Sequence, residues 1–114
     1  MSIYKTSADL IDKVAAIIGR KVPGEALSAI DHDIIDGVID DVLAELSGSI
    51  IAITDRDQIP AQYFLSIARI CAIHCAAEFE NGLVDYDLVR RHEMRLHYLA
   101  DAQPTFEVLQ SDYF

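Results

Sequence analysis

The segment Ile59–Phe79 constrains the fold more than any other part of the chain. Pro60 suits the first helical turn, because proline lacks an N–H that this turn would leave unpaired. Apolar side chains then follow helical spacing on nearly every side of the segment. The interruptions are Gln62, Ser66, Arg69 and Glu78. A helix of this kind must be covered on several sides, and its polar groups argue against a membrane span. We therefore expect the central helix of a small bundle.

The first of three further predicted helices covers about Ser7–Ile18. Thr6 or Ser7 can cap its start, since a hydroxyl oxygen accepts a hydrogen bond from the first helical turn. Gly19 is suited to the left-handed conformation that commonly follows a helix. The preceding residues, Ser2–Lys5, are expected to form a loose arm or a short lead-in.

The second predicted helix runs from Ser28 or Asp31 to Leu46, and the segment 47–49 (Ser-Gly-Ser) ends it. One broad face is apolar and the opposite face is acidic. The acidic residues are Asp33, Asp36, Asp40, Asp41 and Glu45. The β-branched run Ile50–Thr54 that follows is compatible with one strand of a short hairpin or with an extended connection.

The fourth predicted helix begins after Asp85, which can cap it, and ends before Pro104. Its outer side is basic and carries Arg90, Arg91 and Arg95. Between the third and fourth helices, the segment 81–82 (Asn-Gly) is a strong stop signal. The fold class is therefore all-α: a four-helix bundle over residues 1–104.

Residues 105–114 are expected to form an extended C-terminal arm. The arm is rich in large apolar side chains: Phe106, Val108, Leu109, Tyr113 and Phe114. A tail with so many large apolar groups usually docks on another surface. Its own domain, a neighbouring subunit and a partner protein remain alternatives.

Composition narrows the functional classes. The 114 residues suit one domain, and 52% of them are hydrophobic, which is enough for a core. A formal charge of −10 argues against a nucleic-acid binder, although DNA can pass an acidic surface without adhering to it. The start of the chain lacks the pattern of a secretory signal. Cys71 and Cys75 share one helix and are poorly placed for a disulfide, so we expect reduced thiols.

Two groups of residues deserve a test for chemistry. Cys71, His74 and Cys75 share a helical face and could supply part of a zinc site or a thiol–imidazole pair, but buried core residues are the favoured interpretation. The acidic residues of the second helix offer carboxylate pairs, and a solvated face is the favoured interpretation there. The sequence contains no phosphate-binding loop, nucleophile elbow or zinc-protease motif. We therefore predict no enzyme and no cofactor.

The charge asymmetry between the second and fourth helices has two explanations. Asp36, Asp40, Asp41 and Glu45 on one helix could pair with Arg90, Arg91 and Arg95 on the other within a single bundle. Alternatively, the two helices could belong to neighbouring copies, which would create a head-to-tail contact that closes into a ring where the rotation permits. Exposed ion pairs are weak in either arrangement, so the sequence leaves both open.

The order of these features resembles one known family. Thr6–Val14 with Ile18–Gly19 resembles the opening helix of the head-to-tail adaptors of short-tailed bacteriophages, also called tail accessory factors or connectors. Val38–Leu46 resembles their second helix, and Ile59–Pro60 with Leu65–Phe79 resembles their third. The similarity is a pattern of helices and small residues over about residues 6–100, without an invariant catalytic motif.

The resemblance implies a structural virion protein. Copies would assemble in the host cytoplasm into a homo-oligomeric ring of about twelve subunits beneath the portal protein at the head–tail interface. The ring would extend the DNA channel, let DNA pass without specific binding, and dock tail proteins, with no membrane involved. The arm residues Phe106–Phe114 would bind to the portal protein.

Two rival functions belong to other classes. A small cell-wall hydrolase would use carboxylates of the second helix, for which Asp40, Asp41 and Glu45 are the candidates. A cytoplasmic metal-binding or regulatory bundle would use Cys71 and its neighbours. Loss of an activity on amide substitution, and metal analysis of the purified protein, would distinguish these two functions from the adaptor.

Overall fold

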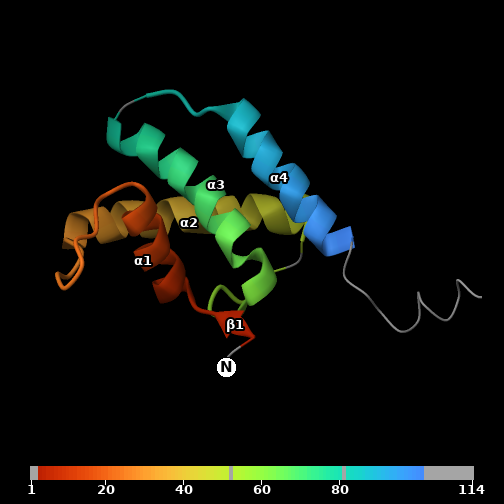
Figure 1. Ribbon diagram of the computed structural model, residues 1–114, viewed down its shortest axis with the longest axis horizontal. Coiled ribbons are helices and arrows are strands. Elements are labelled where there is room, and N and C mark those ends of the chain that lie inside the picture. The colour runs from red at the N-terminus through yellow and green to blue at the C-terminus, as the bar shows by residue number, and fades with distance from the viewer. Residues whose placement is uncertain (1–2, 52, 81, 102–114) are drawn as a thin grey trace, which may run out of the picture.

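The computed structural model describes residues 3–51, 53–80 and 82–101. These residues form four helices and two short strands (Figure 1): β1 (Tyr4–Lys5), α1 (Ser7–Ile17), α2 (Ala29–Ser49), β2 (Ile59–Pro60), α3 (Ala61–Glu80) and α4 (Tyr86–Asp101). The predicted all-α four-helix bundle is therefore confirmed. The segment after Asp101, which includes the whole predicted arm, lies outside the described residues.

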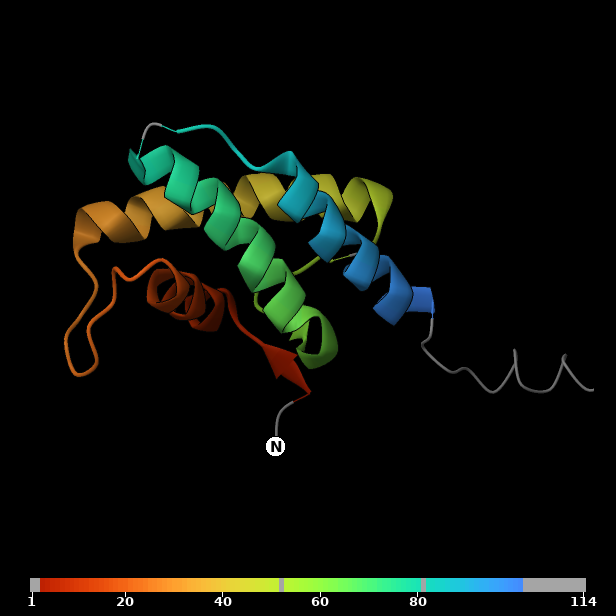
Figure 2. The same cartoon turned by 45° about the horizontal axis from the view of Figure 1, so that its top comes forward.

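Helix α3 lies at the centre of the bundle. It packs against α1, α2 and α4, which surround it on different sides (Figures 1 and 2). Its buried side chains are mixed large and small: Ser66, Ile67, Ala68, Ile70, Cys71, Ala72 and Cys75. The small residues let neighbouring helices approach closely, while the isoleucines fill the space between them. The burial expected of this helix is confirmed.

The other helices each contribute an apolar stripe to the same core. Fully buried residues include Leu10 and Val14 of α1 and Ile35, Ile39 and Leu46 of α2. Helix α4 contributes least, because Val89 and Leu96 are its only buried side chains among the described residues. It therefore lies on the bundle as an outer helix whose remaining surface is exposed.

Helix starts follow the capping residues that the sequence offers. Of the two candidates for α1, Thr6 is the cap: its hydroxyl accepts from the Asp9 N–H at 3.2 Å, and the Asp9 carboxylate accepts from the Thr6 N–H at 3.1 Å. Ser28 caps α2, and Asp85 caps α4 by accepting from the Leu88 N–H at 3.1 Å. Each side-chain oxygen satisfies a donor that the first turn would otherwise leave unpaired.

Gly19 ends α1 as predicted. Its φ of +77° is in the left-handed region, which costs glycine nothing. This conformation turns the Arg20 N–H back to the Ala15 carbonyl at 2.8 Å and the Gly19 N–H to the Ala16 carbonyl at 3.2 Å. The paired carbonyls complete a Schellman motif.

The predicted end of α2 at Leu46 is wrong. The helix continues to Ser49, and the Ser49 hydroxyl donates to the Glu45 carbonyl at 3.1 Å. The Ser47 hydroxyl meanwhile donates to the Ile53 carbonyl and accepts from the Ile53 N–H, at 3.1 and 3.3 Å. These serines bond to the helix and to the following loop instead of ending the helix. The described residues of the run 50–54 form no strand, so the run is the connection and not the hairpin strand.

The strand pair joins two segments for which the sequence predicted other structures, a lead-in and the start of a helix. β1 pairs antiparallel with β2, with Tyr4 opposite Pro60 and Lys5 opposite Ile59. The predicted loose lead-in is therefore partly wrong, and α3 begins at Ala61 and not at Ile59. Ile59 is fully buried, and an extended backbone lets it reach the core while its strand pairs with β1. Such a nonlocal pairing leaves no periodic signal in so short a segment.

The core predicts a contrast between two isoleucines of α2. Ile39 is 0% exposed and Ile30 is 74% exposed. Ile39→Ala should lower the free energy of unfolding by about 2–5 kcal/mol, because it removes buried carbon and leaves a cavity. Ile30→Ala, the matched control, should change it by less than about 0.5 kcal/mol. Urea unfolding followed by helical circular dichroism measures both, and equal effects would contradict this description of the core.

Candidate functional site

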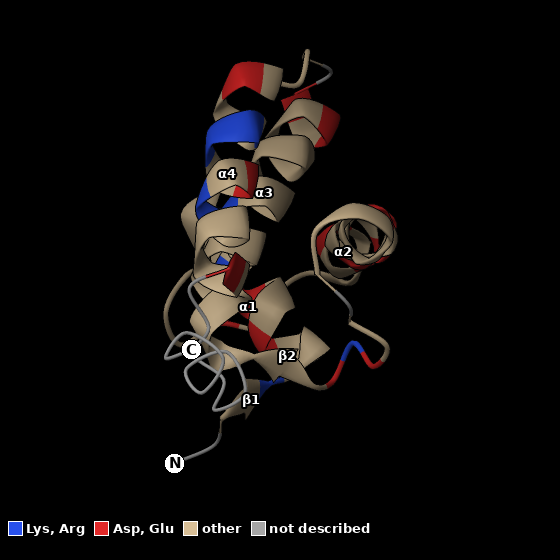
Figure 3. Ribbon diagram, turned by 90° about the vertical axis from the view of Figure 1, so that its right-hand side faces the viewer, with Lys and Arg blue, Asp and Glu red and all other residues tan. Residues whose placement is uncertain are grey.

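The charged surfaces lie on different helices and face different ways. The acidic α2 face (Asp33, Asp36, Asp40, Asp41 and Glu45) is on the second helix. Part of the positive charge of α4 lies on the side of that helix turned away from α2 (Figure 3), whereas Arg90 lines a hollow next to the end of α2. Among the described residues, no ion pair joins α2 to α4. The structure therefore does not bring together the two charged sets that the sequence singled out.

Two of the acidic residues instead bind an arginine that the sequence analysis did not single out. Arg56 donates one Nη to Asp36 and the other to Asp40, so that it bridges two turns of α2. Burial alone would lower the pKa of Arg56, but the hydrogen bond to Asp36 and the nearby carboxylate charges raise it overall. Its position in a polar turn after an acidic helix was the available signal. Asp41 and Glu45 remain exposed beside this pair.

The outer surface of α4 combines positive charge with large exposed side chains. Tyr86, Met94 and Tyr98 are 68%, 63% and 62% exposed. The Arg95 guanidinium lies over the Tyr98 ring, 5.4 Å from its centroid. We define the basic α4 face as Arg90, Arg91 and Arg95 together with Tyr86, Met94 and Tyr98. Tyrosine, methionine and arginine are the residues that protein interfaces favour. The helical spacing of 86, 94 and 98 could have revealed these three in the sequence.

A hollow of about 470 Å³ lies between the basic α4 face and the end of α2. It is lined by Ser49, Ile50, Tyr86, Arg90, Glu93, Met94 and His97. Arg90 therefore lies next to apolar side chains such as Ile50 and Met94. The hollow makes this part of the surface concave, so that a protruding side chain of a partner could fit into it.

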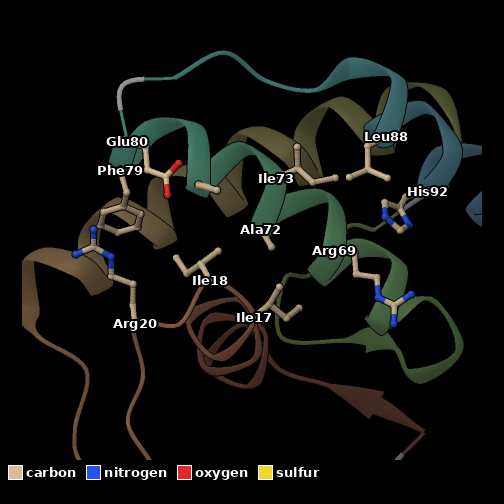
Figure 4. A pocket seen from close by; sticks show the side chains of 11 residues that line it. Ile17, Ile18, Arg20, Arg69, Ala72, Ile73, Phe79, Glu80, Leu88 and His92 are labelled. Carbon is tan, nitrogen blue, oxygen red and sulfur yellow. The ribbon is translucent and has the colours of Figure 1, made fainter.

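A larger groove of about 650 Å³ lies over α3, between the end of α1 and the start of α4 (Figure 4). Its apolar lining is Ile17, Ile18, Ala72, Ile73, Ala76, Phe79 and Leu88, and its polar lining is Arg20, Arg69, Glu80 and His92. We call it the α1–α3–α4 groove. The sequence analysis missed it, because its residues come from three helices whose arrangement no local pattern specifies.

The two cysteines of the cysteine–histidine group of α3 belong to the core, whereas His74 is only partly buried. Cys71 and Cys75 are fully buried, and His74 lies edge-on to the Tyr86 ring with 6.2 Å between centroids. Burial raises the pKa of Cys71, with a smaller effect from Cys75. Burial, and after it the charge of Glu78, raise the pKa of Cys75 to about 12. Within the described ranges, no group of three histidine, cysteine or acidic residues is placed to hold a metal ion.

The predicted arm residues Phe106, Val108, Leu109, Tyr113 and Phe114 lie outside the described residues, so the structure does not place them. In the part of the chain that the structure describes, no helix is long and apolar enough to span a membrane.

Comparisons of the chain with protein-family models, with curated proteins and with solved structures find no match. The fold and these surfaces define a small helical bundle with an acidic face, a basic face and an open apolar groove.

The buried thiols predict low reactivity. A pKa near 12 leaves Cys75 about a thousandfold less thiolate at pH 8 than an ordinary cysteine has, and burial also restricts access of the reagent. We expect iodoacetamide to alkylate neither cysteine of the folded protein on the timescale on which it alkylates both in urea. Intact-mass spectrometry counts the adducts. Rapid labelling of one cysteine without unfolding would show that this part of α3 is accessible.

His92 predicts a pH dependence of stability. Burial, and after it the positive charge of Arg69, lower the pKa of His92 below its ordinary value. The unfolded chain then binds a proton at higher pH than the folded chain does, so the contribution of this group to stability falls as pH drops from about 7 to 5. Wild-type protein should lose more unfolding free energy over this range than His92→Gln does. Urea titrations at both pH values measure the difference, and the carboxylates shared by both chains cancel. Equal losses of unfolding free energy in the two proteins would contradict the proposed contribution of His92.

Proposed function

We propose that the protein is a structural subunit of a bacteriophage head-to-tail adaptor, whose copies form a ring beneath the portal. The observation that carries this proposal is that one subunit presents the acidic α2 face and, on the side of α4 turned away from α2, part of the basic α4 face (Figure 3), with no ion pair between the two helices among the described residues. Two complementary surfaces that do not pair within one subunit allow the same contact to repeat from copy to copy. A repeated contact of this kind generates a ring when the rotation closes.

The composition of the two faces supports such a contact. Exposed ion pairs alone contribute little, because water and salt screen them. The basic α4 face adds Tyr86, Met94 and Tyr98, whose large apolar surfaces are solvent-exposed in the single subunit. Burying these side chains against a neighbour supplies the affinity, while the charges select the orientation of the pair.

The acidic α2 face is partly neutralised before any partner binds. Arg56 already engages Asp36 and Asp40, so Asp41 and Glu45 are the carboxylates of this face that we assign to a neighbour's arginines. Of the seven charged residues that the sequence suggested for subunit pairing, the proposal therefore gives the leading roles to Asp41, Glu45, Arg91 and Arg95. Asp36 and Asp40 instead hold the loop that carries Arg56.

The sequence resemblance supplies the rest of the proposal. It suggests about twelve copies, a portal protein above the ring and tail proteins below it, with the subunits located in the virion. The net charge of −10 suits a channel wall past which DNA moves without binding. The arm with Phe106 and its apolar neighbours would add to the portal, and repetition around the ring would multiply a weak contact.

Charge reversal tests the proposed contact. Arg91→Glu with Arg95→Glu, or Asp41→Lys with Glu45→Lys, should each weaken ring assembly at least about tenfold, because like charges would face each other. All four substitutions in one chain should restore assembly, since the attraction returns with its sign exchanged. Native mass spectrometry of each protein, mixed with the portal protein encoded in the same genome, measures the number of copies bound.

Exposed charges outside both faces provide the controls. Lys13→Glu on α1 and Glu25→Lys in the following loop change the charge in the same directions and should leave assembly unchanged. If no chain, wild-type included, binds the portal, the adaptor function is wrong. If the ring forms but ignores both reversals, the adaptor function survives and the assigned faces are wrong.

A further inference from the structure

The α1–α3–α4 groove exposes apolar surface that the described part of the chain leaves uncovered. Ile17 on the α1 side is 44% exposed and Leu88 on the α4 side is 37% exposed. Ile73 and Phe79 are partly buried between them, and Figure 4 shows these side chains around one open space. Apolar side chains gathered at one concave site favour an apolar ligand.

The polar groups around the groove add a charge preference. Figure 4 shows Arg20 and Arg69 at opposite ends of the apolar lining. The Arg20 guanidinium stacks on the Phe79 ring, 4.1 Å from its centroid, and also lies 3.7 Å from Asp31. Glu80 stands at the Arg20 end, so the end at Arg69 is the more positive one. A ligand that combines large apolar side chains with negative charge fits this arrangement.

The chain itself contains a segment with this chemistry. Residues 102–114 carry Phe106, Val108, Leu109, Tyr113 and Phe114, together with the carboxylates of Glu107 and Asp112. The segment has no lysine, arginine or histidine. We propose that the α1–α3–α4 groove binds segment 102–114 of its own chain, with Phe106–Leu109 on the apolar lining and Glu107 toward Arg69.

The distances along the chain allow this. His92 of α4 lines the groove, and α4 continues for nine residues from His92 to Asp101, which is about 14 Å of helix. From Asp101, the five residues to Phe106 span about 16 Å when extended. The segment can therefore turn back along α4 and place Phe106 at the edge of the groove.

This inference goes beyond the adaptor proposal and does not depend on it, because groove and segment belong to one chain. Where the adaptor proposal also holds, the groove adds a step to assembly. The arm would be shielded in the free subunit and would leave the groove when it adds to the portal. Early aggregation of subunits through exposed aromatic arms would then be suppressed.

Tryptophan fluorescence tests the proposal in the full chain. The sequence contains no tryptophan, so Phe106→Trp introduces a single reporter. We expect its emission to be blue-shifted relative to Leu83→Trp, a matched reporter at a position that is 98% exposed. Adding Ile17→Glu to the Phe106→Trp chain should shift the emission to the red, because a carboxylate enters the apolar lining. Ile30→Glu, at a 74% exposed position of α2, should leave it unchanged.

Dilution and methyl NMR complete the experiment. The blue shift should persist on dilution, since binding within one chain does not depend on concentration. In the otherwise unaltered chain, Phe106→Ser with Leu109→Ser should shift the methyl signals of Ile73 and Leu88 and leave those of Ile30 in place.

Several results would overturn the proposal. The first is emission of Phe106→Trp equal to that of Leu83→Trp, together with unchanged methyl signals. The second is Phe106→Trp emission that does not change when Ile17→Glu is added, although the helical signal is retained. The third is a blue shift that disappears on dilution. The last result would assign the groove to the segment of a second copy.

Discussion

The burial of α3 is the constraint on which the rest of the structure depends. Its apolar side chains point in almost every direction, so no single neighbour can cover it. Helices α1, α2 and α4 each cover one side, and Ile59 of β2 adds a buried side chain at its start. Each large side chain so buried contributes about 1.5–3 kcal/mol. Cys71 and Cys75 belong to this packing, where a small polarizable side chain fits between helices more readily than a branched one.

The loop before β2 is bonded to both α1 and α2. Asp57 accepts from both the N–H and the hydroxyl of Ser7, at 3.1 and 2.7 Å, which ties the start of α1 to this loop. These two hydrogen bonds lower the pKa of Asp57. The neighbouring Arg56 binds α2 through Asp36 and Asp40. Two consecutive residues thus connect α1 and α2, and the charge left on the acidic α2 face is a consequence of that connection.

Local signals were enough to predict the helices. Contacts between residues that are distant in the sequence could not be predicted. Thr6, Gly19 and Asp85 act through bonds to residues within a few positions of them, so their roles are visible in the sequence. The pairing of Tyr4 with Pro60 joins segments more than fifty residues apart, and no periodicity announces it. Ser47 was read as a helix stop because its bond to Ile53 depends on the path of the loop.

The same distinction applies to the candidate site. The charged sets were predictable, because the acidic residues at 33, 36, 40, 41 and 45 fall within one predicted helix and Arg90, Arg91 and Arg95 within another. The contacts of these charged residues were not predictable, because it is the fold that brings Arg56 next to α2. The groove was beyond prediction for a further reason: it is the space that three helices leave between them, and its shape depends on their crossing.

Helix α4 can serve two surfaces because it packs chiefly on α3 alone. One of its sides brings Leu88 and His92 to the groove, and another carries Tyr86, Met94 and Tyr98 outward. Helix α3 is buried on several sides and leaves open chiefly the strip that lines the groove. The thin coverage of α4, with Val89 and Leu96 as its buried anchors, therefore leaves the apolar and basic surfaces that the two proposals use. Because segment 102–114 continues from α4, any shift of this helix on α3 would move the groove lining, the basic α4 face and the start of that segment together.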